Sequence, residues 1–191
     1  MKKVIIIGAG GSLAKYVIAA IKELENIELT LLLRNKNRLS KNDTEDCTII
    51  EGDVMNYNEV KNAIEGQDIV YVNLAGNLEI MAKNIVKAMQ ENKVNRIIAI
   101  SSIGIYEIPL KPVLVPYRKL ADIIENSGLD YTILRPDWFT NDNEIAYTIT
   151  HKGNPEIGSA ISRKSIASFI STIIEQPDLH KNENLGISKP D

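Results

Sequence analysis

The sequence contains one cysteine and two histidines, and this scarcity argues against two kinds of small protein. Cys47 has no second cysteine with which to form an internal disulfide, so we expect a small, buried side chain there. His151 and His180 have no histidine, cysteine or carboxylate at the spacing of a metal site. The sequence therefore predicts neither a disulfide framework nor a bound metal.

The sequence also lacks an excess of positive charge and a long hydrophobic run. With 22 basic and 25 acidic residues the net charge is -3, so no broad positive field attracts nucleic acid or anionic lipid. The first apolar run, residues 4–7, is too short for a signal peptide, and no run is long enough to span a bilayer. We therefore expect a cytoplasmic protein that binds neither nucleic acid nor membrane, and the oligomeric state stays open.

What the chain does contain is an alternation of short apolar runs and helical-period segments. Most of the runs are continuously apolar, as in strands covered by helices on both faces, and they lie at 4–7, 29–33, 48–51, 69–73, 96–101 and 131–134. Helices are expected at 13–24, 57–64, 78–90 and 118–126, and a last one around 166–174.

This order predicts an α/β protein, a three-layer doubly wound parallel sheet that forms a single domain over residues 1–191. Residues 1–136 would form the nucleotide-binding core. Residues 137–191 would form a small substrate-side segment, much of it irregular, because Pro136, Gly153 and Pro155 interrupt the pattern.

A glycine-rich turn, residues 8–14, directly follows the first apolar run and opens the first helix. Glycines here permit a tight turn and let the backbone approach a pyrophosphate, whose charge then faces the N–H groups of the helix N-terminus. The backbone is thus predicted to bind a dinucleotide, and the residues are Gly8, Gly10, Gly11, Ser12 and Leu13. The alternative is a structural turn without a ligand.

The end of the second strand indicates which dinucleotide binds. NAD-binding proteins carry an acidic residue there for the ribose 2′-hydroxyl, whereas this chain has Arg34. A guanidinium would pair with a 2′-phosphate, and Arg38 follows one turn later. NADP (NADPH) is therefore the predicted cofactor, unless Arg34 is only a solvated residue at a strand end.

Further motifs extend this pattern over nearly the whole chain: Gly52-Asp53-Val54, Asn73-Leu74-Ala75-Gly76, Ser101-Ser102-Ile103-Gly104, residues 127–136 and Ile161-Ser162-Arg163. With the glycine turn and Arg34, they resemble the atypical short-chain dehydrogenase/reductase family, in particular its small NmrA-like and flavin-reductase-like members. The resemblance implies a Rossmann fold with Asp53 and Val54 beside the adenine. It also implies that Ala75 and Gly76 follow the ribose and diphosphate and that Pro136 contacts the nicotinamide. Without the resemblance, Asp53 is an ordinary turn or helix-capping residue.

The chain departs from this family in its catalytic residues. Typical members use a serine, a tyrosine and a lysine four residues after the tyrosine, but Tyr117 is followed at that spacing by Ala121. Alignment on residues 127–136 places Arg118 at the position of the lysine. An arginine there could hold a ribose or a phosphate but would stay protonated.

Serines and tyrosines near this point remain candidates for catalysis. Ser101 and Ser102 could orient a substrate carbonyl, and Tyr106 and Tyr117 could donate a proton; Ser101 is also expected beside the cofactor. The two tyrosines could equally be packing residues with hydroxyls at the surface. The catalytic candidates are thus Ser102, Tyr117 and Tyr106.

These patterns together predict an NADP(H)-binding oxidoreductase that reduces a small acceptor, which would be a flavin, a quinone or a carbonyl. Trp138 and Phe139 could wall the acceptor site. The missing Tyr-x-x-x-Lys motif leaves open a regulator of the NmrA-like kind, which binds NADP without turnover. A third possibility is an interaction protein that binds no dinucleotide.

Overall fold

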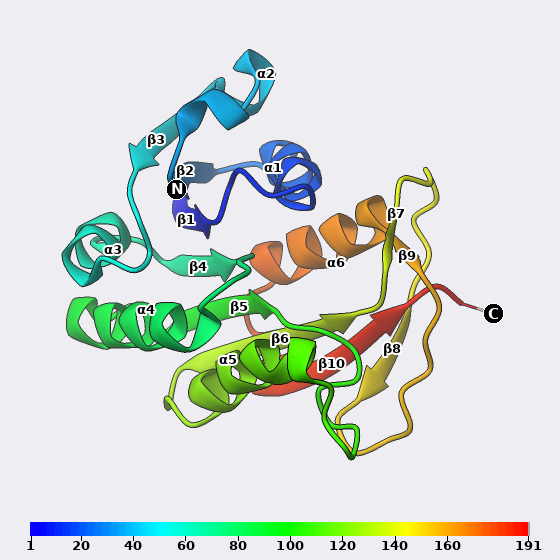
Figure 1. Ribbon diagram of the computed structural model, residues 1–191. Helices are drawn as coiled ribbons and strands as arrows, with labels where there is room; N and C mark the ends of the chain where they lie inside the picture. The colour runs from blue at the N-terminus through cyan, green and yellow to red at the C-terminus, as the bar shows by residue number, and fades with distance from the viewer. Residues whose placement is uncertain (191) are drawn as a thin grey trace.

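The computed structural model describes residues 1–190 and has a mostly parallel, eight-stranded sheet at its centre (Figure 1). The strand order is β3-β2-β1-β4-β5-β6-β10-β8, and β8 is the one antiparallel member. The strands are β1 (Lys2–Ile7), β2 (Ile27–Leu33), β3 (Cys47–Glu51), β4 (Ile69–Val72), β5 (Arg96–Ile100), β6 (Asp130–Pro136), β8 (Thr148–His151) and β10 (Glu183–Ser188). Two short strands, β7 (Phe139–Thr140) and β9 (Ile161–Ser162), pair separately.

Helices cover both faces of the sheet. They are α1 (Ala14–Lys22), α2 (Lys41–Thr44), α3 (Tyr57–Ile64), α4 (Leu78–Asn92), α5 (Val115–Glu125) and α6 (Arg163–Glu175), with short 3-10 helices at Lys36–Arg38 and Pro112–Leu114. The first and last, α1 and α6, pack together on one face, and α3, α4 and α5 line the other. The predicted three-layer α/β fold is therefore confirmed.

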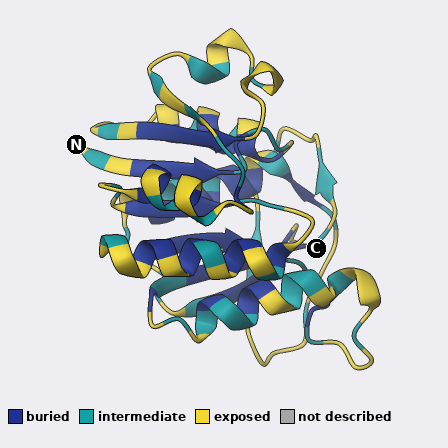
Figure 2. Ribbon diagram, turned by 60° about the vertical axis from the view of Figure 1, so that its left-hand side comes forward, coloured by how far each residue is buried: buried dark blue, intermediate teal, exposed yellow. Residues whose placement is uncertain are grey.

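Two hydrophobic cores, one on each side of the sheet, explain why the central strands are continuously apolar. In β1, Val4 and Ile6 belong to the core beneath α1 and α6, while Ile5 and Ile7 belong to the core beneath α3, α4 and α5. All four side chains are fully buried, and Figure 2 shows the buried strands between helices whose outer faces are exposed. A strand with no face toward solvent needs no polar alternation.

The chain after Pro136 is more regular than its sequence suggests. Strand β10 pairs parallel with β6, β8 extends the sheet beyond it, and the helix expected near 166–174 spans Arg163–Glu175. Strand β10 is hard to recognise in the sequence, because two of its buried residues, Asn184 and Ser188, are polar. This segment thus completes the sheet as well as reaching the site described below.

Two other features bear on the expectations from the sequence. Cys47 is half-buried at the start of β3, and burial raises the pKa of its thiol. No helix within residues 1–190 combines the length and the apolar composition needed to cross a bilayer.

Candidate cofactor and acceptor site

A cavity of about 880 Å³ opens at the carboxyl ends of the parallel strands, where the strand order reverses between β1 and β4. This is where open α/β sheets bind their ligands, and the volume is large for a small-molecule site. Its walls come from residues at and after the strand ends. They lie within residues 8–13, 32–38, 73–75, 100–104 and 136–139, at Gly52 and Val54, and within residues 107–117, which lead into α5.

The glycine turn passes so close to the end of β4 that a side chain has no room. Gly8 has a φ of +91°, and a Cβ atom there would lie 2.1 Å from the carbonyl oxygen of Asn73. The turn is held by the N–H groups of Gly8 and Ala9, which donate to the carbonyl of Leu32 at 3.0 and 3.2 Å. Only glycine satisfies both the positive φ and the contact at position 8.

The same turn leaves hydrogen-bond donors without a partner. Within residues 1–190, the backbone N–H groups of Gly10, Ser12 and Leu13 donate to no protein acceptor, and α1 begins directly behind them at Ala14. Unpaired donors at a helix N-terminus, with the positive end of the helix dipole, suit a phosphate. The turn therefore fits the diphosphate of a dinucleotide.

Two arginines line the cavity beside this turn. Arg34 follows the end of β2 and Arg38 ends the short helix after it; both are exposed, and neither side chain makes an ion pair or hydrogen bond within residues 1–190. Arg38 packs its stem on the turn, because a Cβ atom on Gly10 would lie 3.5 Å from the Cβ and Cδ of Arg38. Lys36, between them, pairs with Glu51 at 3.5 Å. Two arginines without an ion pair within residues 1–190, rather than a carboxylate, thus line the cavity beside the glycine turn.

Most other predicted cofactor residues also line the cavity, and they are Val54, Ala75, Ser101 and Pro136. Asp53 and Gly76 are not part of the wall. The carboxylate of Asp53 accepts from the N–H of Met55 at 2.9 Å, and its own N–H donates to Glu59 at 2.7 Å. Asp53 therefore stabilises the turn before α3, as the alternative interpretation expected.

Ser102 and Tyr117, two of the catalytic candidates, lie at the cavity wall. The hydroxyl of Ser102 donates to the carbonyl of Ile103 at 3.2 Å, and that of Ser101 donates to the carbonyl of Tyr117 at 3.0 Å, which joins the end of β5 to α5. No cation lies over the ring of Tyr117 among the contacts of residues 1–190, and Lys119 pairs with Glu79 instead. Within residues 1–190, no hydrogen bond or cation–π contact therefore joins a lysine to Tyr117.

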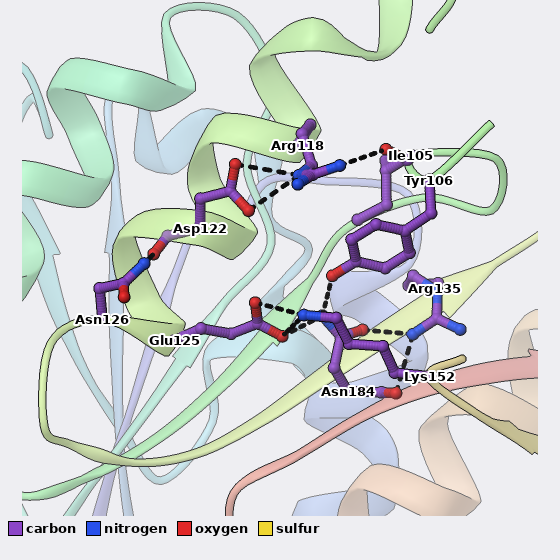
Figure 3. Close-up of polar contacts among 9 residues, drawn as sticks. All are labelled: Ile105, Tyr106, Arg118, Asp122, Glu125, Asn126, Arg135, Lys152 and Asn184. Carbon is purple, nitrogen blue, oxygen red and sulfur yellow. Dashed lines mark hydrogen bonds and ion pairs between the residues drawn. The ribbon is translucent and has the colours of Figure 1, made fainter. Parts of the chain in front are cut away.

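Arg118 and Tyr106, in contrast, do not line the cavity; Figure 3 shows them among their polar contacts. Arg118 donates to both carboxylate oxygens of Asp122 at 2.8 and 2.9 Å and lies 4.7 Å from the ring centroid of Tyr106. The hydroxyl of Tyr106 accepts from Asn184, and burial raises the pKa of this phenol. The cofactor role expected of Arg118 has no geometric support, because its i,i+4 acid on α5 draws the guanidinium away.

Comparison with known proteins decides the family. A family model described as NAD(P)H-binding matches residues 8–177. The chain belongs to this NAD(P)H-binding family. Since the match includes the glycine turn and most of the cavity wall, the protein is an NAD(P)-binding member of an oxidoreductase-like family.

Solved structures agree with this assignment. A Rossmann-fold NAD(P)-binding family protein from Shigella flexneri is 43% identical, with a TM-score of 0.91, over 100% of this chain and 94% of that one. A short-chain dehydrogenase/reductase from Veillonella parvula, solved in complex with NADP, is 25% identical, with a TM-score of 0.89, over 99% and 95% of the two chains. ChuY, an anaerobillin reductase from Escherichia coli O157:H7, shares the fold at 18% identity and a TM-score of 0.82, over 100% and 98%. The resemblance to atypical short-chain dehydrogenases/reductases is confirmed.

One wall of the cavity in this NAD(P)H-binding protein was only partly visible in the sequence. Trp138 and Phe139 were expected there, but Lys111, Val113 and Leu114 were not. Trp138 is 83% exposed and Val113 is 71% exposed, so two large apolar side chains border the opening without protein contacts to bury them. Val113 lies between β5 and α5, and Trp138 follows β6. Since both segments start at the carboxyl end of a strand, chain order could have indicated that these residues lie near the site.

Proposed function

We propose that this protein is an NADPH-dependent reductase of a small acceptor, which is a flavin, a quinone or a carbonyl compound. The observation that carries the choice of NADP over NAD is the pair Arg34 and Arg38, which face the cavity beside the glycine turn with no acidic partner within residues 1–190. Their planar donors match the 2′-phosphate of NADP in shape and charge. The relative solved with NADP supports the same choice.

The chain's residues divide the cavity into a cofactor end and an acceptor end. The unpaired N–H groups of Gly10, Ser12 and Leu13 would hold the diphosphate. Pro136, Ser102 and Trp138 line another part of the same cavity. The bound NADPH would supply the hydride. The protein would then bind the acceptor against apolar side chains, exclude water from it and offer the hydroxyls of Ser102 and Tyr117 as hydrogen-bond donors.

Removing either arginine tests the cofactor choice. In Arg34→Ala and Arg38→Ala we expect the dissociation constant for NADP to rise about tenfold, and that for NAD to change little, because a charge-assisted hydrogen bond to phosphate is worth about 1.5–3 kcal/mol. Isothermal titration calorimetry at one salt concentration measures both. Lys36→Ala is the matched control, since Lys36 already pairs with Glu51. Equal affinities of the wild type for NAD and NADP would contradict the choice.

Turnover tests the reductase itself. With FMN, menadione and an aromatic aldehyde as acceptors, we expect oxidation of NADPH above background for at least one of them. Trp138→Ala should raise the KM of that acceptor by about threefold to tenfold, because it removes a stacking surface worth about 0.5–1.5 kcal/mol, and leave the KM for NADPH unchanged. Stopped-flow absorbance at 340 nm follows the reaction.

A second candidate function is favoured by one observation: within residues 1–190, no hydrogen bond or cation–π contact joins a lysine to Tyr117. In that case the protein would bind NADP without oxidising or reducing it, and would regulate a protein partner. Tight NADP binding with no oxidation of any acceptor in the panel would favour this regulator over the reductase.

A further inference from the structure

A buried arginine next to the cavity is the centre of a closed ring of hydrogen bonds. Arg135, near the end of β6, is 1% exposed. Its Nε donates to Oε1 of Glu156 at 2.6 Å, and its Nη1 donates to the carbonyl of Asn184 at 2.8 Å and also to the side-chain Oδ1 of Asn184. The guanidinium thus joins β10 to the loop that contains Glu156.

Both partners of Arg135 reach onward to the same short segment. Oε2 of Glu156 accepts from the backbone N–H of Gly104 at 2.6 Å. On the other side, Nδ2 of Asn184 donates to the hydroxyl of Tyr106 at 2.8 Å (Figure 3). Hydrogen bonds therefore hold the chain on both sides of Ile105, at Gly104 and at Tyr106, and the buried guanidinium links the two partners and so closes the ring.

The segment held in this way forms the acceptor wall of the cavity. Ser102, Ile103 and the held residue Gly104 line the cavity, and so do Glu107 and Lys111 after Tyr106. The loop of Glu156 also packs there, since a Cβ atom on Gly158 would lie 2.5 Å from Cδ1 of Ile103. The glycine turn and the two arginines at the cofactor end make no hydrogen bond with this ring within residues 1–190.

We propose that Arg135 and Glu156 are positioning residues that fix the loop of residues 101–111 at the acceptor end of the cavity. The inference rests on the proposed function, because it assigns an acceptor to this wall. Neither residue touches the acceptor; each acts through Gly104 and Tyr106. Tyr106, on this account, anchors the loop and does not transfer a proton.

A carboxylate at position 156 is what the geometry needs. Its two oxygens face two donors, the Nε–H of Arg135 and the N–H of Gly104. A glutamine has nearly the same shape but only one acceptor oxygen, so its NH₂ group must confront one of these donors. Glu156→Gln therefore opens the ring at one bond without removing the packing of the side chain.

The test compares Glu156→Gln and Tyr106→Phe with the wild type in two ways. Hydrogen–deuterium exchange should speed up in residues 102–107 and stay unchanged in residues 8–14. In steady-state assays with FMN, menadione and an aromatic aldehyde, the KM of the acceptor that the wild type reduces fastest should rise about tenfold, while the KM for NADPH changes by less than about twofold. In Tyr106→Phe, kcat should be nearly retained.

Glu91→Gln is the matched control, because Glu91 makes an equally short ion pair, 2.6 Å to Lys61, on the outer surface of α4. It should alter neither measurement. Unchanged exchange at residues 102–107 in Glu156→Gln, or a parallel rise in both KM values, would overturn the inference, and loss of kcat in Tyr106→Phe would restore a catalytic role for Tyr106. If the wild type reduces no acceptor, the proposed function fails, and exchange alone then decides whether the ring holds the loop.

Discussion

Replacing Gly8 by alanine is expected to abolish dinucleotide binding and to lower the free energy of unfolding by about 3 kcal/mol or more. The new Cβ would lie 2.1 Å from a backbone carbonyl oxygen at the end of β4 and would stand on a backbone with a φ of +91°. Neither β1 nor β4 can retreat, because both are central strands of the sheet. Urea denaturation gives the stability, and calorimetry with NADP gives the affinity.

Gly66→Ala is the matched control for this substitution. Gly66 also has a positive φ, +73°, at the end of α3, but nothing lies within 4 Å of a Cβ atom there. The cost should be about 1 kcal/mol, from the backbone alone, and the affinity for NADP should not change. A similar loss of stability in both variants would show that the contact with β4 is unimportant.

Replacing Arg135 by methionine is the second substitution with a large expected effect, a loss of about 3 kcal/mol in the free energy of unfolding. Methionine fills much of the space but donates no hydrogen bond. The carboxylate of Glu156 and the two oxygens of Asn184 that now accept from the guanidinium would lose these hydrogen bonds. Thermal and urea unfolding, read by circular dichroism, would measure the loss.

Arg118→Met provides the comparison, because Arg118 also lies over the ring of Tyr106 and also pairs with a carboxylate. Its side chain is 38% exposed, and its partner Asp122 is on the same helix. Exposed i,i+4 pairs contribute about 0.5 kcal/mol, and Arg118 also donates to the carbonyl of Ile105 at 3.3 Å, a long hydrogen bond, so this variant should lose about 1 kcal/mol. Equal losses in the two variants would mean that burial of Arg135 adds nothing.

The nucleotide-binding half could be predicted from the sequence because its signals are local. Strands buried on both faces are continuously apolar, and the glycine turn needs glycine for reasons that lie within a few residues and one neighbouring strand. The place of Arg34 in the cavity wall could be predicted in the same way, since its position at the end of β2 follows from chain order.

What escaped prediction depends on contacts between distant segments. Strand β10 carries Asn184 because the buried Arg135 needs a polar partner, and that requirement removes the hydrophobic pattern by which a strand is recognised. Arg118 binds Asp122, and Tyr106 binds Asn184 of β10, so neither side chain lines the cavity. No spacing in the sequence indicates these contacts. The cavity wall between β5 and α5 was therefore less predictable than the glycine turn.

The place of β10 in the sheet has a consequence for synthesis on the ribosome. Residues 183–188 leave the exit tunnel after every other strand of the sheet, yet they pair with β6 on one side and β8 on the other. Until then, the nascent chain carries β6 as a bare edge, open to pairing with neighbouring polypeptides.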